Sequence, residues 1–186
     1  MFMNTIVSLI VGMLLFSFNN TQAATLDYSH AASLKETPKK VVREFLNWYK
    51  DNRENLQRYQ LVPVNIRDSA YRVDFNEAEK YLNELKRSGF VSDKYIASFR
   101  NYLKERDANL KRYPQYDGTP DGFGFDLVLK ADNFNEILDH INKAKVITKP
   151  VNEDSVKVYL RFPGVVMALT LTRSGKTWLI DSLDYV

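Results

Sequence analysis

The hydrophobic pattern of this chain changes period near residue 145, and this change constrains the fold more than any other feature. Before it, apolar residues recur at spacings of three and four, as in amphipathic helices. After it, they alternate with polar residues in segments joined by the short turns "PG" and "SG", as in half-buried strands. Turns this short connect antiparallel neighbours. The pattern therefore predicts an α+β fold, with amino-terminal helices on one face of an antiparallel sheet.

Four helical segments are expected. The first follows Thr37, whose hydroxyl can cap the helix, with Pro38 at its first position. The second starts at Asp74, with Glu77 reaching back in a capping box, and the third starts at Ser92. A shorter fourth covers about residues 134–143. The side chains expected to face inward are Val41, Val42, Phe45, Leu46, Tyr49, Leu56, Phe75, Ala78, Leu82, Leu85, Ile96, Phe99, Leu103, Leu110, Ile137, Leu138 and Ile141.

The expected sheet lies in the carboxyl-terminal part of the chain. Residues 156–162, 167–171 and 176–186 alternate strongly, and residues 146–151 add a fourth strand. The segment "FDLVLKA", from Phe125, also alternates like a short strand.

The amino terminus reads as an export signal. Residues 5–18 are almost wholly apolar and uncharged, and Thr21 and Ala23 provide small residues before a cleavage site. The run is shorter than a membrane span needs, although "MFMN" lacks the usual Lys or Arg, so an uncleaved anchor is the alternative. We expect a signal peptide at 1–23, a flexible start at 24–36, a single domain at 37–186, and a periplasmic or secreted protein without a stable membrane anchor.

Composition removes several function classes. The chain has no cysteine, which excludes disulfides, thiolate catalysis and attachment of lipid to a cysteine. The net charge is only +3, and Lys and Arg alternate with Glu and Asp along the expected helices, so nucleic acid is not expected as a partner. His30 and His140 have no second histidine at metal spacing, and neither G-x-S-x-G nor S-x-x-K occurs.

The loop "YPQYDGTPDGFGFD", residues 113–126, is the remaining candidate for a metal site. Its aspartates Asp117, Asp121 and Asp126 are spaced by four and five residues, whereas calcium loops place carboxylates at every second position. Its three glycines suit a chain that leaves a helix and reverses direction. We interpret the loop as a turn, and expect neither a metal nor a cofactor.

The end of the chain suggests a family. "GKTWLIDSL", a strand with Trp-x-Ile-Asp after a tight glycine turn, resembles the last strand of the nuclear transport factor 2-like superfamily, the cystatin-like cone. Within it, "TPKKVVREFLNWY", "SDKYIASF" and "GFDLVLKADNF" resemble the exported bacterial domain of unknown function numbered 3828. The resemblance covers about Thr37–Leu183 and implies a strongly curved sheet with helices in its concave face. Unlike many such relatives, this chain lacks a lipobox cysteine, and the superfold leaves function open.

The aromatic residues are the best candidates for a binding site. In the mouth of such a cone five of them could line a ligand pocket: Trp48, Tyr49, Tyr102, Tyr159 and Trp178. An isomerase on this fold would use an aspartate as base and a tyrosine hydroxyl to stabilise an enolate-like oxygen, with Asp126 or Asp181 and Tyr159 as candidates. An open pocket with an aspartate within about 3 Å of a tyrosine hydroxyl would favour such catalysis. Otherwise the aromatic residues are simply core.

The leading hypothesis is a non-enzymatic exported domain that binds a small ligand or another protein, for example as an immunity-type protein. The helical segments 43–58 and 94–113, rich in Tyr and Arg, would provide the protein-binding surface. The alternative is a small-molecule isomerase or hydrolase-like enzyme with an Asp/Tyr pocket. A homodimer formed through the sheet is a third hypothesis.

Overall fold

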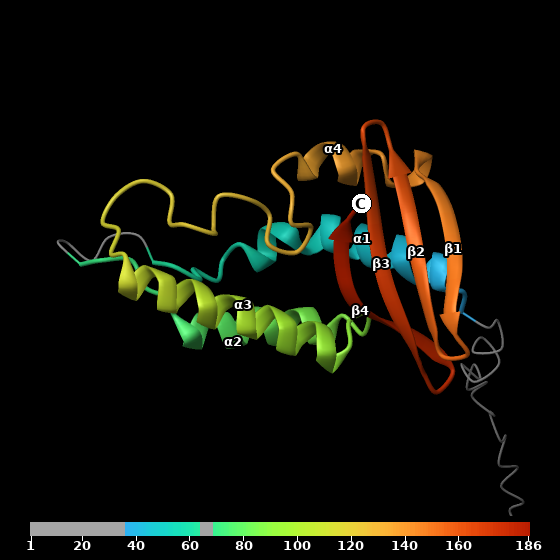
Figure 1. Cartoon of the computed structure of the whole chain (residues 1–186), viewed down its shortest axis with the longest axis horizontal. Helices are drawn as coiled ribbons and strands as arrows, with labels where there is room; N and C mark the ends of the chain where they lie inside the picture. Colours follow the sequence, from blue (N-terminus) through green and yellow to red (C-terminus); the bar gives the residue numbers. More distant parts are fainter. Residues whose placement is uncertain (1–35, 64–68) are drawn as a thin grey trace, which may run out of the picture. The chain divides into compact units, whose positions relative to one another are not determined.

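The helices precede the sheet, as the change of period predicts. The computed structural model describes residues 36–63 and 69–186, so the expected signal peptide, its cleavage site, His30 and nearly all of the expected flexible start lie outside the described residues. The described elements are α1 (Pro38–Leu56), α2 (Phe75–Arg87), α3 (Asp93–Arg112), α4 (Phe134–Asp139), the 3-10 turn η2 (Ile141–Lys143), β1 (Lys145–Asn152), β2 (Ser155–Phe162), β3 (Val165–Ser174) and β4 (Thr177–Tyr185) (Figure 1).

The three long helices start at the expected caps. The side-chain oxygens of Thr37, Asp74 and Ser92 each accept a hydrogen bond from a backbone N–H in the first turn of the following helix. The capping box at Asp74 is only half formed, because the carboxylate of Glu77 binds Lys80 at 2.6 Å instead of reaching back. Gly89 has a φ of +75° and follows α2 as the expected left-handed stop.

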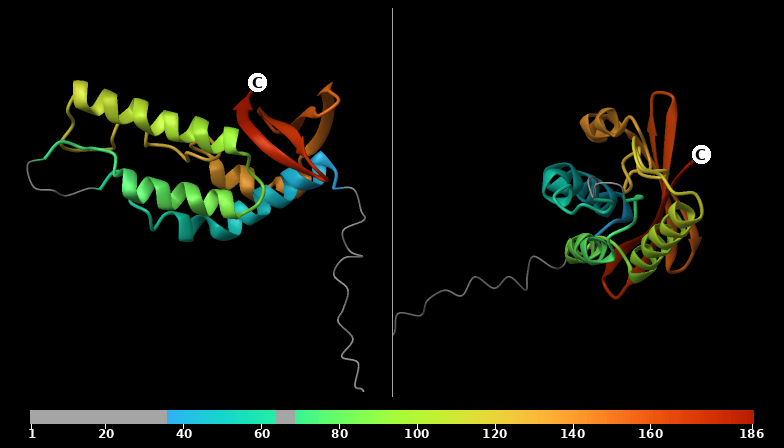
Figure 2. Two further views of the ribbon diagram at one scale, coloured as in Figure 1. Left: turned by 90° about the horizontal axis from the view of Figure 1, so that it is seen from below. Right: turned by 90° about the vertical axis from the view of Figure 1, so that its left-hand side faces the viewer.

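The four strands form an antiparallel meander in the order β1-β2-β3-β4. Alternate side chains such as Val158, Leu160 and Leu169 are fully buried, and their neighbours point to the opposite face. Figure 2 shows the helices gathered on one side of the sheet, so the buried side chains face the helices. Helices on one face of an antiparallel sheet confirm the α+β class.

The sheet is irregular at β4. Thr170 pairs with Ser182 whereas Leu171 pairs with Ile180, so Asp181 is an extra residue that forms a β-bulge. Bulges bend a strand and increase its twist. The free edge of β4 is partly covered, because the backbone N–H of Ile180 donates to Phe90 at 2.8 Å and its carbonyl accepts from Ser92 at 2.9 Å.

Two local expectations are wrong. Phe75, expected in the core, is 37% exposed, whereas Tyr81 on the same helix is 7% exposed and packs with the core. The segment from Phe125 is no strand: only Asp126 and Ala131 pair as an isolated bridge, and the residues between them form turns. The reason is the carboxylate of Asp126, which provides a competing local partner for the backbone.

Candidate functional site

Asp126 fastens the loop before α4 to helix α1. Its Oδ1 accepts hydrogen bonds from the backbone N–H groups of Val128, at 3.2 Å, and Leu129, at 2.8 Å. Its Oδ2 accepts one from the hydroxyl of Tyr49 on α1, at 2.7 Å. The Nε of Arg53 lies 3.4 Å from the same oxygen, with its guanidinium 3.8 Å from the ring centre of Phe134. The carboxylate is only 4% exposed.

Several tyrosines around this carboxylate are held in the neutral form. Burial raises the pKa of Tyr49 far above its usual range, and repulsion from Tyr81 in its ionised form and from the negative charge of Asp126 acts in the same direction. Burial also raises the pKa of Tyr81 and Tyr95, and the negative charge of Asp126 adds to both effects. Burial raises the pKa of Tyr185 to about 12, again with a contribution from Asp126.

The bonding of Asp126 limits its chemistry. A general base needs an oxygen that can reach the proton it removes. Here Oδ1 is occupied by two backbone N–H groups and Oδ2 by the Tyr49 hydroxyl, with Arg53 beside it. Tyr49 in turn directs its proton at Asp126. The pair therefore has the Asp–Tyr spacing that would favour catalysis, but its donors and acceptors are used to hold the loop in place.

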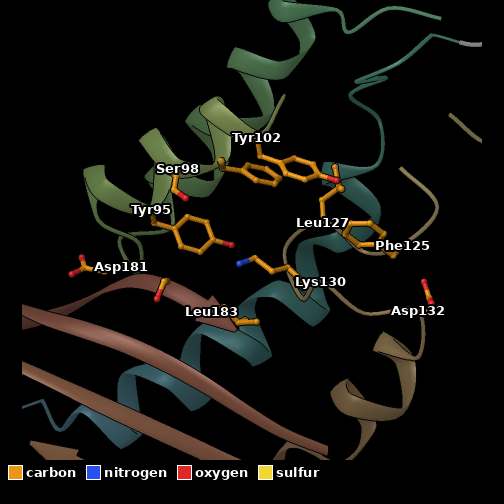
Figure 3. Close-up of a pocket in the computed structure, with 11 residues that line it drawn as sticks. Tyr95, Ser98, Tyr102, Phe125, Leu127, Lys130, Asp132, Asp181 and Leu183 are labelled. Atoms are coloured by element: carbon orange, nitrogen blue, oxygen red, sulfur yellow. The ribbon is translucent and has the colours of Figure 1, made fainter. Parts of the chain in front are cut away.

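A cavity of about 330 Å³ lies between α3, the segment 125–132 and the end of β4; we call it the α3–β4 cavity. Volumes above about 300 Å³ are typical of small-molecule sites. Rings form much of the wall, and hydroxyls, one ammonium group and two carboxylates complete it (Figure 3). Its lining includes Tyr95, Ser98, Phe99, Tyr102, Phe125 and Lys130.

The polar groups of the α3–β4 cavity are unevenly placed. Figure 3 shows the Tyr95 hydroxyl and the Lys130 ammonium group near the middle of the lining residues, with Asp132 and Asp181 at opposite ends. Lys130 has a φ of +52°, uncommon for a residue with a side chain, and its Nζ binds Asp184 at 2.9 Å. That pair is exposed at both partners, so it holds the ammonium group only weakly.

Tyr102 joins the cavity to the loop "YPQYDGTPDGFGFD". Its hydroxyl donates a hydrogen bond to the carbonyl of Gly122 at 2.6 Å, and its ring lines the cavity. Asp121 accepts from the amide of Asn109 at 2.7 Å. Gly122 and Asp121 thus hold the middle of the loop against α3, whereas Asp126 at its end binds Tyr49 on α1. Over the described ranges, 36–63 and 69–186, no group of three or more His, Asp or Glu residues is placed to hold a metal ion.

A second cavity, of about 300 Å³, lies on the α1 side of the same segment; we call it the α1 cavity. Phe125 and Leu127 line both cavities. Tyr49 and Asp126 line the α1 cavity, together with Tyr81. The segment 125–127, held by Asp126, thus contributes to the walls of both.

Comparison of the chain with protein-family models, with curated proteins and with solved structures found no match. Among the helices of the described residues, none is long and apolar enough to cross a membrane.

The five aromatic residues expected to line one pocket are dispersed. Tyr102 lines the α3–β4 cavity and Tyr49 the α1 cavity. Trp48 is half-buried beside Phe45 and Phe90. Trp178 is 7% exposed in the core. Tyr159 points to the opposite face of the sheet, because it lies between the inward-facing residues of β2. Because Tyr102 and Tyr49 line different cavities and the other three residues line neither, the structure does not bring the five residues together in the expected common pocket.

The three catalytic candidates are likewise apart. Tyr159 lies on the outer sheet face, whereas Asp126 lies in the loop on the helix side. Asp181 is 6% exposed in the bulge of β4, two strands from Tyr159, and accepts a hydrogen bond from the hydroxyl of Thr172 at 2.6 Å. Lys94 lies 3.9 Å from the same oxygen. Neither aspartate forms the expected pair with Tyr159.

Sequence reasoning missed most of the cavity wall. The sequence patterns do not indicate Tyr95, Phe125 or Lys130 as site residues, and they predict Phe99 only as a core residue, yet all four line the α3–β4 cavity. The helical spacing of Tyr95, Phe99 and Tyr102 on α3 was the available signal, because residues three and four apart share a helix face. Nothing local indicated that residues 125–132 would lie opposite them.

Proposed function

We propose that this protein is an exported, non-enzymatic binding protein that holds a small organic molecule in the α3–β4 cavity. The observation that carries the proposal is the cavity itself: about 330 Å³ walled by Tyr95, Phe99, Tyr102 and Phe125, with the Lys130 ammonium group and the Tyr95 hydroxyl near its centre. Apolar walls with a few polar groups are the usual composition of small-molecule sites.

The lining indicates the chemistry of the ligand. Aromatic walls favour a flat or aliphatic body that can pack against rings. Lys130 and Tyr95 both offer hydrogen-bond donors, and the weak exposed pair with Asp184 leaves Lys130 able to change partner. A ring that carries one carboxylate or a similar acceptor fits these groups.

A small ligand is better supported than a protein partner on the helices. The helical segments 43–58 and 94–113, rich in Tyr and Arg, are expected from the sequence to provide a protein-binding surface. Tyr49 and Tyr95 are instead buried, and Tyr102 is half-buried over the cavity. Of the tyrosines in these two segments, Tyr113 is the one with an exposed ring, at 58%. An immunity-type role would therefore have to use the charged groups of these helices.

The proposal also includes a nuclear transport factor 2-like fold family and export from the cytoplasm. The likeness to the nuclear transport factor 2-like cone is supported by the helices on one face of an antiparallel meander and by the bulge at Asp181. Export is supported by the apolar run at 5–18 followed by Thr21 and Ala23.

Enzymatic activity is the second candidate, favoured by the 2.7 Å contact of Tyr49 and Asp126 in the wall of the α1 cavity. The contact has the spacing needed for an isomerase, but the carboxylate already accepts from two backbone N–H groups and from Tyr49. For this reason binding is the better supported function.

Thermal-shift screening of the purified protein against aromatic carboxylates and their neutral amides tests the proposal. A ligand that binds the folded state raises the unfolding midpoint by mass action. Ser98→Phe should fill the cavity and abolish the shift, whereas Ala97→Phe, on the neighbouring exposed position outside the lining, should keep it. Lys130→Gln should reduce the thermal shift caused by the aromatic carboxylates more than the shift caused by their neutral amides. Shifts that survive Ser98→Phe unchanged would place the ligand elsewhere.

A further inference from the structure

The first two strands carry the same five-residue pattern in opposite directions. Residues 145–149 read "KVITK" and residues 157–161 read "KVYLR". In the antiparallel register Lys145 lies opposite Arg161, Lys149 lies opposite Lys157, and an apolar–aromatic pair lies between them. We call this group the basic face; it consists of Lys145, Ile147, Lys149, Lys157, Tyr159 and Arg161.

The basic face lies on the side of the sheet away from the helices. The residues between its members, Val146, Val158 and Leu160, pack in the core. Because side chains alternate along a strand, the basic face points outward. Its four cationic residues are exposed, and its Ile147 and Tyr159 are half-buried. Figure 2 shows no helix over this side of the sheet within the part of the chain that the structure describes.

The four cations of the basic face repel one another, which destabilises the folded protein. Like charges directly opposite each other on neighbouring strands destabilise the pair, and here two such pairs occur. Among the described residues, no salt bridge joins any of the four cations to a carboxylate. The Nζ of Lys149 lies 5.4 Å from the ring centre of Tyr159, which compensates only weakly.

The carboxylates closest in sequence or in the sheet do not neutralise these cations. Glu153 and Asp154 lie in the turn between β1 and β2, beyond the last cation. On β4, Asp184 binds Lys130 at 2.9 Å and Asp181 accepts from Thr172. The cations of β1 and β2 thus form a one-sided patch whose repulsion an external anionic surface would relieve.

The geometry of the patch indicates the shape of that surface. Cations four residues apart on one strand are about 13 Å apart, and those on neighbouring strands are about 5 Å apart. They are spread over a plane around an apolar centre and do not converge on one point or line a groove. Val151, 56% exposed, extends the apolar surface toward the β1–β2 turn. Single-stranded nucleic acid is usually bound in a positively charged groove, whereas a bilayer presents a plane of charged headgroups over acyl chains.

We propose that the basic face docks this protein on the surface of a bilayer that contains anionic phospholipid. The lysines and the arginine contact the headgroups, and Ile147, Tyr159 and Val151 lie against the boundary of the acyl chains. This peripheral contact is separate from the α3–β4 cavity and from any amino-terminal anchor. Each cation near an anionic surface contributes roughly a fivefold increase in association, so four give a few-hundred-fold increase.

Co-sedimentation of the full-length protein with vesicles tests the docking. One vesicle type contains phosphatidylcholine alone and the other adds phosphatidylglycerol. The measured quantity is the ratio of the two partition constants, because an apolar segment alone would bind both types. Lys149→Gln with Lys157→Gln should lower this ratio roughly 25-fold. The control, Lys39→Gln with Lys104→Gln, removes the same charge from exposed positions on α1 and α3 and should change the ratio much less.

Three outcomes would overturn the docking proposal. The wild-type ratio could equal one, both double variants could lower it equally, or the basic face could bind an oligonucleotide while showing no vesicle preference. A misfolded variant would not be mistaken for a positive result, because the thermal midpoint is measured too. Removing one like-charge pair should leave the midpoint unchanged or raise it.

Discussion

The hydroxyl of Tyr49 on α1 donates a 2.7 Å hydrogen bond to Oδ2 of Asp126, which lies 77 positions further along the chain. The same carboxylate holds the turn at Val128 and Leu129 through its other oxygen. One side chain thus sets the local conformation of the loop and its attachment to the first helix. Because Phe125 and Leu127 line both cavities, the contact also fixes a wall of the proposed binding site.

Tyr49→Phe should lower the free energy of unfolding by about 1–3 kcal/mol, because it leaves a buried carboxylate oxygen without its best donor. Urea unfolding at neutral pH measures the loss as a lower midpoint at constant slope. Tyr59→Phe is the matched control, since its hydroxyl makes only a 3.4 Å contact with Glu84. If Tyr49→Phe and Tyr59→Phe lower the free energy of unfolding equally, the Tyr49–Asp126 hydrogen bond does not stabilise the protein more than the long contact of Tyr59.

The neutral tyrosines predict that stability falls steeply above about pH 10. Burial raises the pKa of Tyr49, Tyr81, Tyr95 and Tyr185 in the folded state, so above pH 10 the unfolded state releases protons that the folded state keeps. Each such group lowers the free energy of unfolding by about 1.4 kcal/mol per pH unit until the pH reaches its folded-state pKa. Together the four tyrosines would cancel a typical free energy of unfolding of about 5–15 kcal/mol within two or three pH units above pH 10.

Tyrosinate absorbance and circular dichroism, followed together with rising pH, measure this effect. The last part of the absorbance change should coincide with the loss of secondary structure, and should reverse with it on return to neutral pH. If all the tyrosines ionise while the dichroism stays native, the rings around Asp126 are more accessible than the structure indicates.

The parts of the fold that the sequence predicts well are those determined by near neighbours. Thr37, Asp74 and Ser92 cap their helices because a cap needs only a side-chain oxygen next to the first turn. The period of two likewise gives β2 and β3 their buried faces, because alternation alone decides which side chains share a face.

The failures come from contacts distant in sequence or from competing local bonds. The segment from Phe125 alternates like a strand, but the carboxylate of Asp126 binds the backbone two and three residues ahead and forms a turn instead. Tyr159 is an exception, because its alternation with Val158 and Leu160 already places it on the face of β2 opposite to these buried side chains. The basic face was visible as "KVITK" and "KVYLR", but its meaning depends on a register in which the cations meet.

Asp107 should lose its stabilising effect in acid. It is 3% exposed on α3, where Arg72 binds both of its oxygens, at 2.8 and 3.1 Å, and Lys111 lies 3.0 Å away. The hydrogen bond from Arg72 is the main reason that the pKa of Asp107 falls to about 2. Since the folded-state pKa is depressed, the stabilisation is complete above the unfolded pKa of about 4 and is lost as the pH falls toward 2.

Asp107→Asn tests this sign. At about pH 6 it should cost about 2 kcal/mol, and at about pH 3 the cost should be about 1 kcal/mol smaller. Denaturant unfolding at both pH values gives the comparison. Asp93→Asn, which removes a carboxylate that is 94% exposed and paired with Lys86, should cost less than about 0.5 kcal/mol at either pH. A cost for Asp107→Asn that is larger in acid would contradict the assignment.

Gly122→Ala should be more harmful than Gly118→Ala, although both glycines have positive φ, of +84° and +70°. The shared strain of placing alanine at such a φ costs about 1 kcal/mol. At position 122 the new methyl group would also overlap the side chain of Arg106 and lie 2.8 Å from the hydroxyl of Tyr102, whereas at 118 it meets nothing within 4 Å. Tyr102 would then lose its hydrogen bond to the Gly122 carbonyl, and its ring would shift in the α3–β4 cavity.

We expect Gly122→Ala to lower the free energy of unfolding, measured in urea, by at least about 1 kcal/mol more than Gly118→Ala does. Gly122→Ala should also weaken any ligand-induced thermal shift that Gly118→Ala preserves. If the two variants have the same stability and the same ligand-induced thermal shift, the contact between Gly122 and Tyr102 does not affect the α3–β4 cavity.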